Sequence, residues 1–322
     1  MKNSRKNIHS FIHTFENGRR TASKLTILLI ISQLAIFSCK SLVKEIDPSV
    51  LPQTDSKLVV ACFISPQDTV LAAKVTETKV LIGSTGGIRD DITNATIKLS
   101  DGTKTINLVY SASNAYYRAL PSALPIIAGK TYTIEVSTPD GRKINATTTV
   151  PISAGIKDIK LDSAKVTDSR GGNTSTNTEY SVKLIWQDKA GIANFYRGIG
   201  VFEVNSKSNN GVNTISSPIV DFRTIDDKGT DGELISLTGV YQARPQGGGG
   251  TGGGNQNQAN ISLRRITVAL LQTDPSYFYY HASLRRQRDN NNPFAEPILL
   301  YTNVNGGFGC FGAYNATWQL VK

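Results

Sequence analysis

Histidine, cysteine and methionine are scarce in this chain, and their scarcity limits the chemistry that it can perform. The 322 residues include three histidines, three cysteines and one methionine. His9 and His13 lie in the first 38 residues, which leaves His281 alone in the remainder. A His/Cys metal site then lacks a ligand set, and a catalytic triad would have to use His281 with no elbow motif near any serine. We therefore expect no enzyme, no cofactor and no metal site of this kind, and expect His281 to pack on a helix face.

A transmembrane-length apolar run is also missing. The apolar run at residues 25–37 has 13 residues, whereas a membrane-spanning helix needs about 20. Six basic residues and one acidic residue precede it, and Ser38 and Cys39 follow it. This order is typical of a bacterial lipoprotein signal peptide. We predict that residues 1–38 are removed and that Cys39 receives the lipid; an uncleaved anchor is the alternative.

Concentrated positive charge is lacking once this segment is removed. The net charge of the whole chain is +10 and falls to +5 without residues 1–38. Basic residues gather only at Arg285, Arg286 and Arg288. Binding to nucleic acid needs a larger basic surface. We interpret the charge as a contribution to solubility and expect no nucleic-acid partner.

Two cysteines remain after lipidation of Cys39. Cys62 and Cys310 lie in strand-like apolar segments at the two ends of the mature chain. In an oxidising compartment they could form a disulfide that closes a long loop and stabilises the fold by roughly 2–5 kcal/mol. Two buried free thiols that behave as small apolar residues are the other interpretation. The sequence leaves both open.

Short β-branched and aromatic runs separated by turn signals fill most of the chain. Residues 57–151 have regularly spaced strands, with tight turns predicted at Asp101-Gly102 and Asp140-Gly141 because glycine tolerates positive φ. This spacing predicts an immunoglobulin-like β-sandwich. Residues 152–322 predict a second β-rich domain, and residues 39–56, which contain two prolines, predict a tether. The fold class is therefore mainly β.

One helix is predicted near residues 274–288. Asp274 can cap it and Pro275 suits its first position. Tyr277, Tyr280 and His281 then fall on one face. We expect this aromatic face to pack on the second sheet, with a ligand-stacking surface as the alternative.

Two polar segments invite a binding interpretation. The acidic segment at residues 226–233 contains Asp226, Asp227, Asp231 and Glu233, but its spacing misses the alternating ladder of a calcium loop. We expect a solvated turn there. The glycine run at residues 247–254 lacks the Lys-Ser/Thr of a phosphate-binding loop, so we expect a flexible loop.

The order of these pieces resembles a known family. Cys39, KEID, KLVVACFISPQDTV, AGKTYTIEVSTPDGRKINATTTVP, IWQD, NFYR and NPFAEPILLYTNVNGGFGCFGAY follow one another as in the domain of unknown function family 4249 of Bacteroidota lipoproteins. The resemblance covers essentially the whole mature chain. Its most specific part is the closing signature, which consists of Asn292, Pro293, Phe294, Glu296, Pro297, Asn303, Gly306, Gly307, Gly309, Phe311 and Gly312.

The closing signature has two interpretations. Three glycines within four residues require a sharp bend or a close approach of another chain segment, which suits a bulged terminal strand that seals the second sheet. The other interpretation is a binding surface. That surface would be formed by Phe294, Glu296, Asn303, Gly306, Gly307, Phe308, Gly309 and Phe311.

The resemblance implies an envelope lipoprotein that is often associated with TonB-dependent outer-membrane receptors. Lys40 follows Cys39 in place of an aspartate retention signal, which favours the outer membrane and leaves its leaflet open. We expect a non-enzymatic binding or accessory protein, held in the membrane by its lipid, that works with such a receptor. A stand-alone structural or adhesive envelope module is the alternative.

Overall fold

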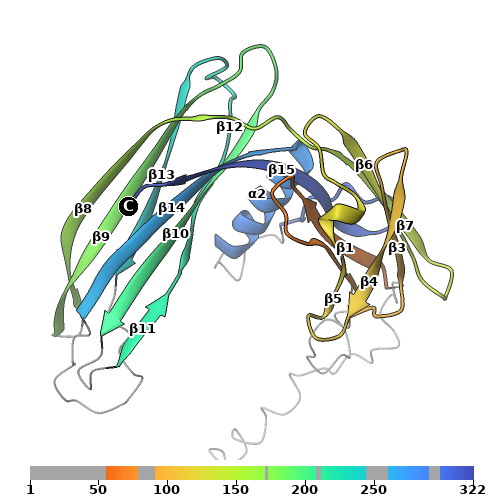
Figure 1. Ribbon diagram of the computed structural model, residues 1–322, viewed down its shortest axis with the longest axis horizontal. Coiled ribbons are helices and arrows are strands. Elements are labelled where there is room, and N and C mark those ends of the chain that lie inside the picture. The colour runs from red at the N-terminus through yellow and green to blue at the C-terminus, as the bar shows by residue number, and fades with distance from the viewer. Residues whose placement is uncertain (1–55, 79–90, 171–172, 208–211, 244–259, 290–297) are drawn as a thin grey trace, which may run out of the picture. The chain divides into compact units, whose positions relative to one another are not determined.

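Strands dominate the chain, and one α-helix accompanies them in the part that the structure describes. A computed structural model describes residues 56–78, 91–170, 173–207, 212–243, 260–289 and 298–322 (Figure 1). All of them belong to one compact unit. The mainly β prediction is confirmed, while the immunoglobulin-like type of the first domain stays a prediction. Cys39 and the predicted tether up to residue 55 lie outside the described residues.

Seven strands form the first half of the described chain. They are β1 (Leu58–Ile64), β2 (Leu71–Glu77), β3 (Thr96–Ser100), β4 (Thr105–Ser111), β5 (Tyr116–Ala119), β6 (Thr131–Ser137) and β7 (Lys143–Thr149), with a 3-10 turn, η3 (Pro121–Ala123). They pair in the order β1-β2-β5-β4-β3-β6-β7, always antiparallel. Gly102 and Gly141 have φ values of +87° and +88° in the β3–β4 and β6–β7 turns, so both predicted turns are confirmed.

Alternating apolar residues of these strands build a first core. In β1, the side chains of Leu58, Val60, Cys62 and Ile64 are buried, and the residues between them are half-buried. This period of two places one face of the strand in the core. At the far edge, the backbone of Asn145 in β7 exchanges two hydrogen bonds with that of Asn305, at 2.8 and 3.3 Å. The sheet therefore curls until its last strand meets the segment before the C-terminal strand.

The second half adds eight strands and the helix. They are β8 (Ile156–Arg170), β9 (Asn173–Gln187), β10 (Phe195–Lys207), β11 (Asn213–Ser216), β12 (Ile219–Asp226), β13 (Leu234–Ala243), β14 (Asn260–Thr273), α2 (Pro275–Asp289) and β15 (Phe308–Leu320). β13, β9 and β8 form a three-stranded sheet, whereas β10 pairs with β11, β12 and β14 in the other sheet. A second core, which includes Trp186, Phe202 and Phe222, draws its residues from both sheets.

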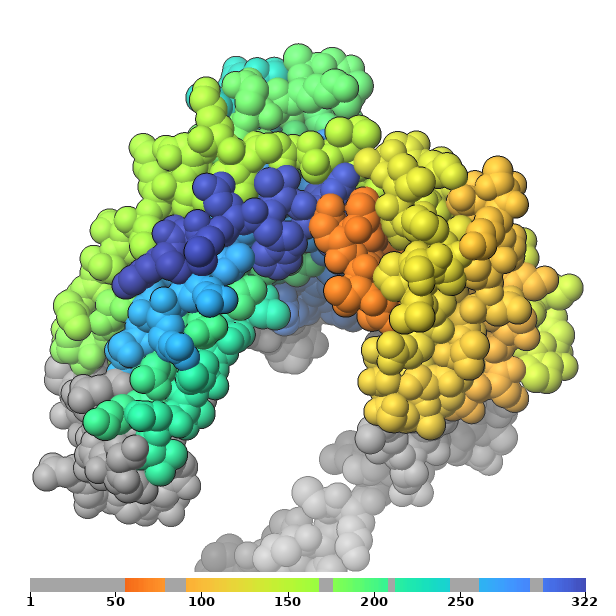
Figure 2. Space-filling model, in the orientation of Figure 1, coloured from red at the N-terminus to blue at the C-terminus, as the bar shows by residue number. Residues whose placement is uncertain are grey.

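β15 connects the two halves. Its first part, up to Ala313, pairs in parallel with β1, and its second part, from Tyr314, pairs antiparallel with β14. Figure 2 shows this strand in dark blue between β1 in orange and β14 in light blue. The predicted boundary near residue 151 lies between β7 and β8. However, Val304, Phe311 and Ala313 belong to the first core although they come from the end of the chain.

The helix α2 covers the face of β10, β14 and β15 that points away from the second core. Tyr277 is buried there with Ala269, Leu271 and Ala316. Asp274 precedes the helix and accepts hydrogen bonds from the backbone N–H groups of Ser276 and Tyr277 at 3.2 and 2.9 Å, as an N-cap does. The predicted helix is therefore confirmed. Within the described residues, no helix combines the length and the hydropathy that a bilayer crossing requires.

Candidate functional site

The closing signature serves to build β15 in the structure. Gly309 has a φ of +105°, and a Cβ at this position would overlap the carbonyl oxygen of Val60 in β1. A Cβ at Gly307 would lie 2.5 Å from the carbonyl oxygen of Leu58. Both glycines therefore permit the close parallel approach of β15 to β1, whose register runs unbroken from Phe308 to Ala313. The expected terminal strand is present, but this part of it pairs with the first half of the chain and carries no bulge.

The other members of the predicted binding surface have similar structural tasks. The Asn303 side chain exchanges hydrogen bonds of 2.8 and 3.0 Å with the backbone of Phe311, whose ring lies in the first core. Among the described members, Phe308 is the only side chain that stays exposed, at 47%. Gly306 has a φ of +81° beside Lys143. Phe294 and Glu296 lie outside the described residues.

The disulfide considered from the sequence is not formed, because the two thiols point to opposite faces of one sheet. Cys62 pairs with Phe311, and Cys310 pairs with Ala61 in the next position of the parallel ladder. Neighbouring positions of a strand face opposite ways. Cys62 accordingly lies in the first core, while the Cys310 sulfur lies 3.5 Å from the Ser276 carbonyl oxygen of α2. Both are free, buried thiols whose pKa values burial raises.

A cavity of about 620 Å³, here called the junction cavity, opens where four segments converge. They are the end of β7, the linker at residues 151–155, the β9–β10 loop and the start of α2. Its walls combine the apolar side chains of Ile152 and Ile192, which are 62% and 51% exposed, with polar groups of Asn194, Gln272 and Asp274. Cavities of 300–1,000 Å³ with this mixture are typical of ligand sites.

Asn194 fixes one wall of the junction cavity. This side chain is buried, and its amide nitrogen donates to the carbonyl oxygens of Lys189 and Ile192, both at 2.9 Å. Its amide oxygen accepts a hydrogen bond from Gln272 of β14 at 2.6 Å. The wall is therefore preorganised, which lowers the entropy cost of binding.

A second cavity, of about 460 Å³, lies between α2 and the strands β10 and β12. We call it the arginine pocket, because Arg197, Arg285 and Arg288 line it together with Asp221 and His281. Arg197 donates two parallel hydrogen bonds of 3.1 Å to the Asp221 carboxylate, and Arg285 donates a third of 2.8 Å. Burial alone would raise the pKa of Asp221, but its hydrogen bonds with Arg197 and the two positive charges lower it, so the carboxylate stays ionised.

A β-bulge places Asp221 in the arginine pocket. Arg197 pairs with Thr224 and Ile199 pairs with Asp221, which leaves one extra residue in β12. Arg223 in this bulge has a φ of +89°, and its N–H donates to Asp221 at 3.2 Å. Bulges redirect side chains at functional sites. The sequence pattern gives no sign of this bulge, so Arg197 and Asp221 were not predicted as site residues.

His281 stands at the inner wall of the arginine pocket among aromatic rings. Its ring centroid lies 5.2 Å from that of Phe63 and 4.2 Å from that of Tyr277. Nδ1 lies 3.4 Å from Arg197, which can only donate, so the proton belongs on Nε2. Burial, with a contribution from Arg197, lowers the pKa of His281 to about 4. The neutral ring packs and orients Arg197, in agreement with the packing role expected from the sequence.

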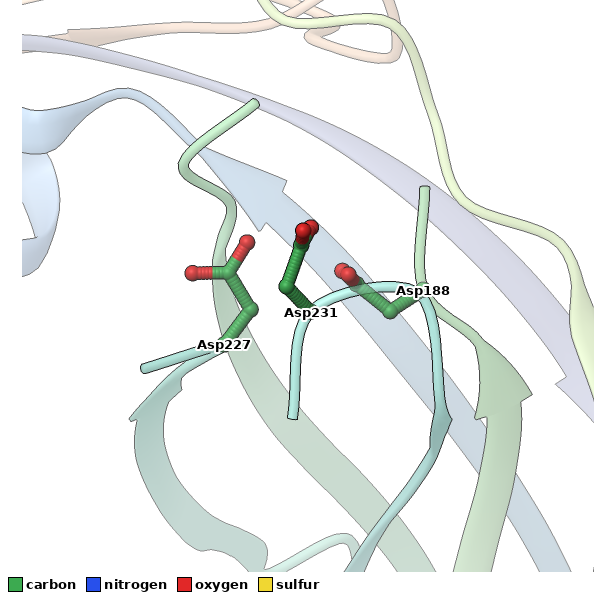
Figure 3. Close-up of side chains that lie close together, drawn as sticks. All are labelled: Asp188, Asp227 and Asp231. Atoms are coloured by element: carbon green, nitrogen blue, oxygen red, sulfur yellow. The ribbon is translucent and has the colours of Figure 1, made fainter. Parts of the chain in front are cut away.

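A third group of polar residues comprises Asp188, Asp227 and Asp231, here called the aspartate cluster. One carboxylate oxygen from each lies within 4.8 Å of the other two. Figure 3 shows the Asp231 side chain between the other two. Asp227 and Asp231 come from the predicted acidic turn, whereas Asp188 follows directly after β9, about 40 residues earlier. The sequence pattern therefore did not connect them.

Hydrogen bonds inside the protein account for much of the aspartate cluster. Asp188 accepts from the Tyr196 hydroxyl at 2.5 Å and from the Gly232 N–H at 2.8 Å. Asp227 and Asp231 each accept from one backbone N–H of the β9–β10 loop, at 2.7 and 2.9 Å. The carboxylates thus tie two loops together. They could supply one oxygen ligand each to a cation, whereas calcium takes six to eight.

These observations define a mainly β protein with two ligand-sized cavities beside its helix. The chain belongs to the family described as a domain of unknown function (DUF4249), whose model matches residues 43–319. The family resemblance seen in the sequence is therefore confirmed. No curated protein matches the chain significantly. The family has no assigned chemistry, so a function has to be inferred from the cavities and the residues that line them.

Proposed function

We propose that this protein is a lipid-anchored, non-enzymatic binding protein of the outer membrane that works with a TonB-dependent receptor. The junction cavity is the observation that carries the binding role. Four separate segments build it, its polar wall is fixed by Asn194, and two exposed isoleucines stand at its edge. Exposed apolar side chains that rim a preorganised polar cavity favour recognition of a ligand or of a partner's loop.

In the arginine pocket, the state of the titratable groups supports binding without catalysis. General acid–base catalysis requires a group that exchanges protons near neutral pH. His281 has a pKa of about 4, and its Nδ1 faces Arg197. Asp221 is ionised and held by two arginines. In the arginine pocket, neither group is prepared to transfer a proton at pH 7.

The membrane part of the proposal rests on the sequence. The basic stretch, the apolar run at residues 25–37 and Cys39 supply a lipid anchor, and β1 begins at Leu58. The tether at residues 39–56 would let the binding module reach a partner in the same membrane.

The test is a crosslinked pull-down of the full, lipidated chain from its native outer membrane, followed by mass spectrometry. Wild type should recover a TonB-dependent receptor at near-equal stoichiometry. Ile192→Trp, which obstructs the junction cavity, should lose most of it. Val109→Arg alters a side chain that is 69% exposed and does not line this cavity, so it should behave as wild type.

Two outcomes would contradict the proposal. Recovery of no specific partner by wild type would favour a stand-alone structural or adhesive module. Equal recovery by wild type and Ile192→Trp would remove the junction cavity from the interaction. Cys39→Ser should release the protein from the membrane fraction, and its retention there would contradict the lipid anchor.

A further inference from the structure

The arginine pocket carries more positive charge than its own ion pairs neutralise. Arg197 and Asp221 form a closed pair, in which Nε and one terminal nitrogen of Arg197 both bind the carboxylate. The remaining terminal nitrogen of Arg197 donates to the Tyr277 hydroxyl at 2.7 Å. Since His281 is neutral, Arg285 and Arg288 leave the pocket with a net charge of +2.

Arg285 and Arg288 have guanidinium N–H donors that no described residue of the chain uses. Arg285 uses one terminal nitrogen for Asp221, which orients its guanidinium, and its other N–H groups have no partner among the described residues. Arg288 makes no ion pair with any residue in the described part of the chain. Helix-dipole stabilisation explains a cation in the last turn of α2, but Arg286 would supply that equally well, and Arg286 does not line the pocket. The helix dipole therefore does not explain why Arg285 and Arg288 both line the pocket.

The lining between these arginines suits a small anionic ligand. Thr224 contributes a hydroxyl, Gln287 contributes an amide, and Leu284 provides an apolar wall. A guanidinium fork matches two oxygens of a carboxylate, sulfate or phosphate. The volume of about 460 Å³ admits such a group with a short organic body.

We propose that the arginine pocket binds an oxyanion group, a carboxylate, sulfate or phosphate, through Arg285 and Arg288. Asp221 acts as a positioning residue, because it holds Arg285 toward the cavity while Arg197 neutralises its charge. The Tyr277 hydroxyl and Nδ1 of His281 both contact one terminal nitrogen of Arg197 and so hold its guanidinium in place. This site is separate from the junction cavity, and its existence does not depend on a receptor partner.

The experiment is calorimetric titration of the full chain, in detergent and at constant ionic strength, with sodium phosphate, sodium sulfate and sodium citrate in turn. At least one of them should bind at a single saturable site. Each charge-assisted hydrogen bond lost in Arg285→Gln or Arg288→Gln should weaken binding roughly tenfold to hundredfold. Arg286→Gln keeps the same change of net charge outside the pocket and should stay within about twofold of wild type.

Vesicles of phosphatidylglycerol, compared with phosphatidylcholine, identify the source of the group. Binding of free anions assigns a small ligand, and binding of the vesicles alone assigns a lipid headgroup, provided that Arg288→Gln removes it. Absence of saturable binding to every probe would overturn the proposal. An equal loss in Arg286→Gln and Arg288→Gln would also overturn it, because it would show attraction to net charge rather than to a site.

Discussion

Gly309 holds the tightest contact between β15 and β1. It combines a φ of +105° with a position directly against the Val60 carbonyl oxygen. Gly141 has a similar φ of +88° in an open turn, where an added Cβ would meet no atom within 4 Å. Substituting Gly141 therefore tests the free-energy cost of a left-handed backbone alone. Substituting Gly309 adds the cost of steric overlap with β1.

We predict that Gly141→Ala lowers the free energy of unfolding by about 1–2 kcal/mol, the cost of the backbone conformation alone. Gly309→Ala should lower it by about 2–5 kcal/mol, because overpacking adds about 1–3 kcal/mol. Urea unfolding followed by circular dichroism measures both. Equal losses in the two variants would show that β15 can move away from β1 at little cost.

Asp68 gives the stability a pH dependence. It accepts hydrogen bonds from Tyr314 at 3.0 Å and Ser65 at 2.7 Å, yet burial outweighs them and raises its pKa to about 6. The folded state therefore binds a proton more tightly than the unfolded state, so this residue's contribution falls as pH rises from about 4 to 6. The stability of Asp68→Asn relative to wild type should increase over this window, by less than about 1.4 kcal/mol per pH unit. A relative stability that is constant from pH 4 to 7 in urea titrations would contradict the shift.

His281 acts in the opposite direction. Its pKa of about 4 lies below the ordinary value of 6.5, so the unfolded state binds protons more tightly and the contribution of His281 to stability rises between pH 4 and 6.5. His281→Phe keeps an aromatic ring beside Phe63 and removes the titration. The stability of wild type relative to this variant should rise with pH over that window and level off above it. A flat difference would show that His281 binds its proton equally well in the folded and the unfolded protein, which contradicts the lowered pKa.

At the scale of elements, Asp274 joins the start of α2 to β15. Its side chain caps the helix, and the Oδ1 atom that binds the Tyr277 N–H also accepts the Ala313 N–H at 2.9 Å. Asp274→Ala should lower the free energy of unfolding by about 2–4 kcal/mol, because a cap is worth about 1 kcal/mol and a buried unpaired donor costs about 1–3 kcal/mol. Asp274→Asn keeps one acceptor oxygen and should lose less than half of that amount. Thermal unfolding of both variants against wild type tests this, and equal losses would point to charge rather than hydrogen bonding.

Local signals predicted the elements whose hydrogen bonds are local. The cap and proline before α2 and the Gly102 and Gly141 turns were readable because their partners lie within a few residues. The segment 298–304 contains a short apolar run but forms no strand, and the Ser283 hydroxyl of α2 accepts a hydrogen bond from its Tyr301 N–H at 3.0 Å. An apolar run does not indicate whether a neighbouring strand is available to pair with it.

The arginine pocket could not be predicted from the sequence, because contacts between segments that are distant in the chain form it. The basic end of α2 was visible as Arg285, Arg286 and Arg288, but the sequence does not show which of them face a cavity. The other wall of the cavity comes from the bulge in β12, where Phe222 fits against Gly198 and Gly200 of β10 and Gly239 of β13. A Cβ at Gly239 would overlap the Phe222 ring. These three glycines lie on two strands that are not adjacent in sequence, so no local pattern reveals the fit.

At the scale of the whole molecule, the shared strand β15 should make the two cores unfold together. Leu99 is fully buried in the first core and Trp186 in the second. Leu99→Ala should cost about 2–5 kcal/mol and should shift the tryptophan fluorescence transition by as much as the circular dichroism transition. Leu120→Ala, at a side chain that is 62% exposed, serves as the control and should shift neither. A fluorescence midpoint that stays at its wild-type value in Leu99→Ala would show that the cores unfold independently.

The position of β15 in the chain has a consequence for biosynthesis. Gln67, just after β1, forms its hydrogen bond with Asn315 across 248 residues, and β1 gains its parallel neighbour only when β15 has been made. Throughout translation, the nascent chain therefore keeps the edges of β1 and β14 unpaired, which is the kind of surface that holding chaperones bind and that proteases reach. A chain released early by a premature stop keeps that exposure permanently. Coverage of these two edges by β15 is therefore the structural difference between a finished and a truncated copy.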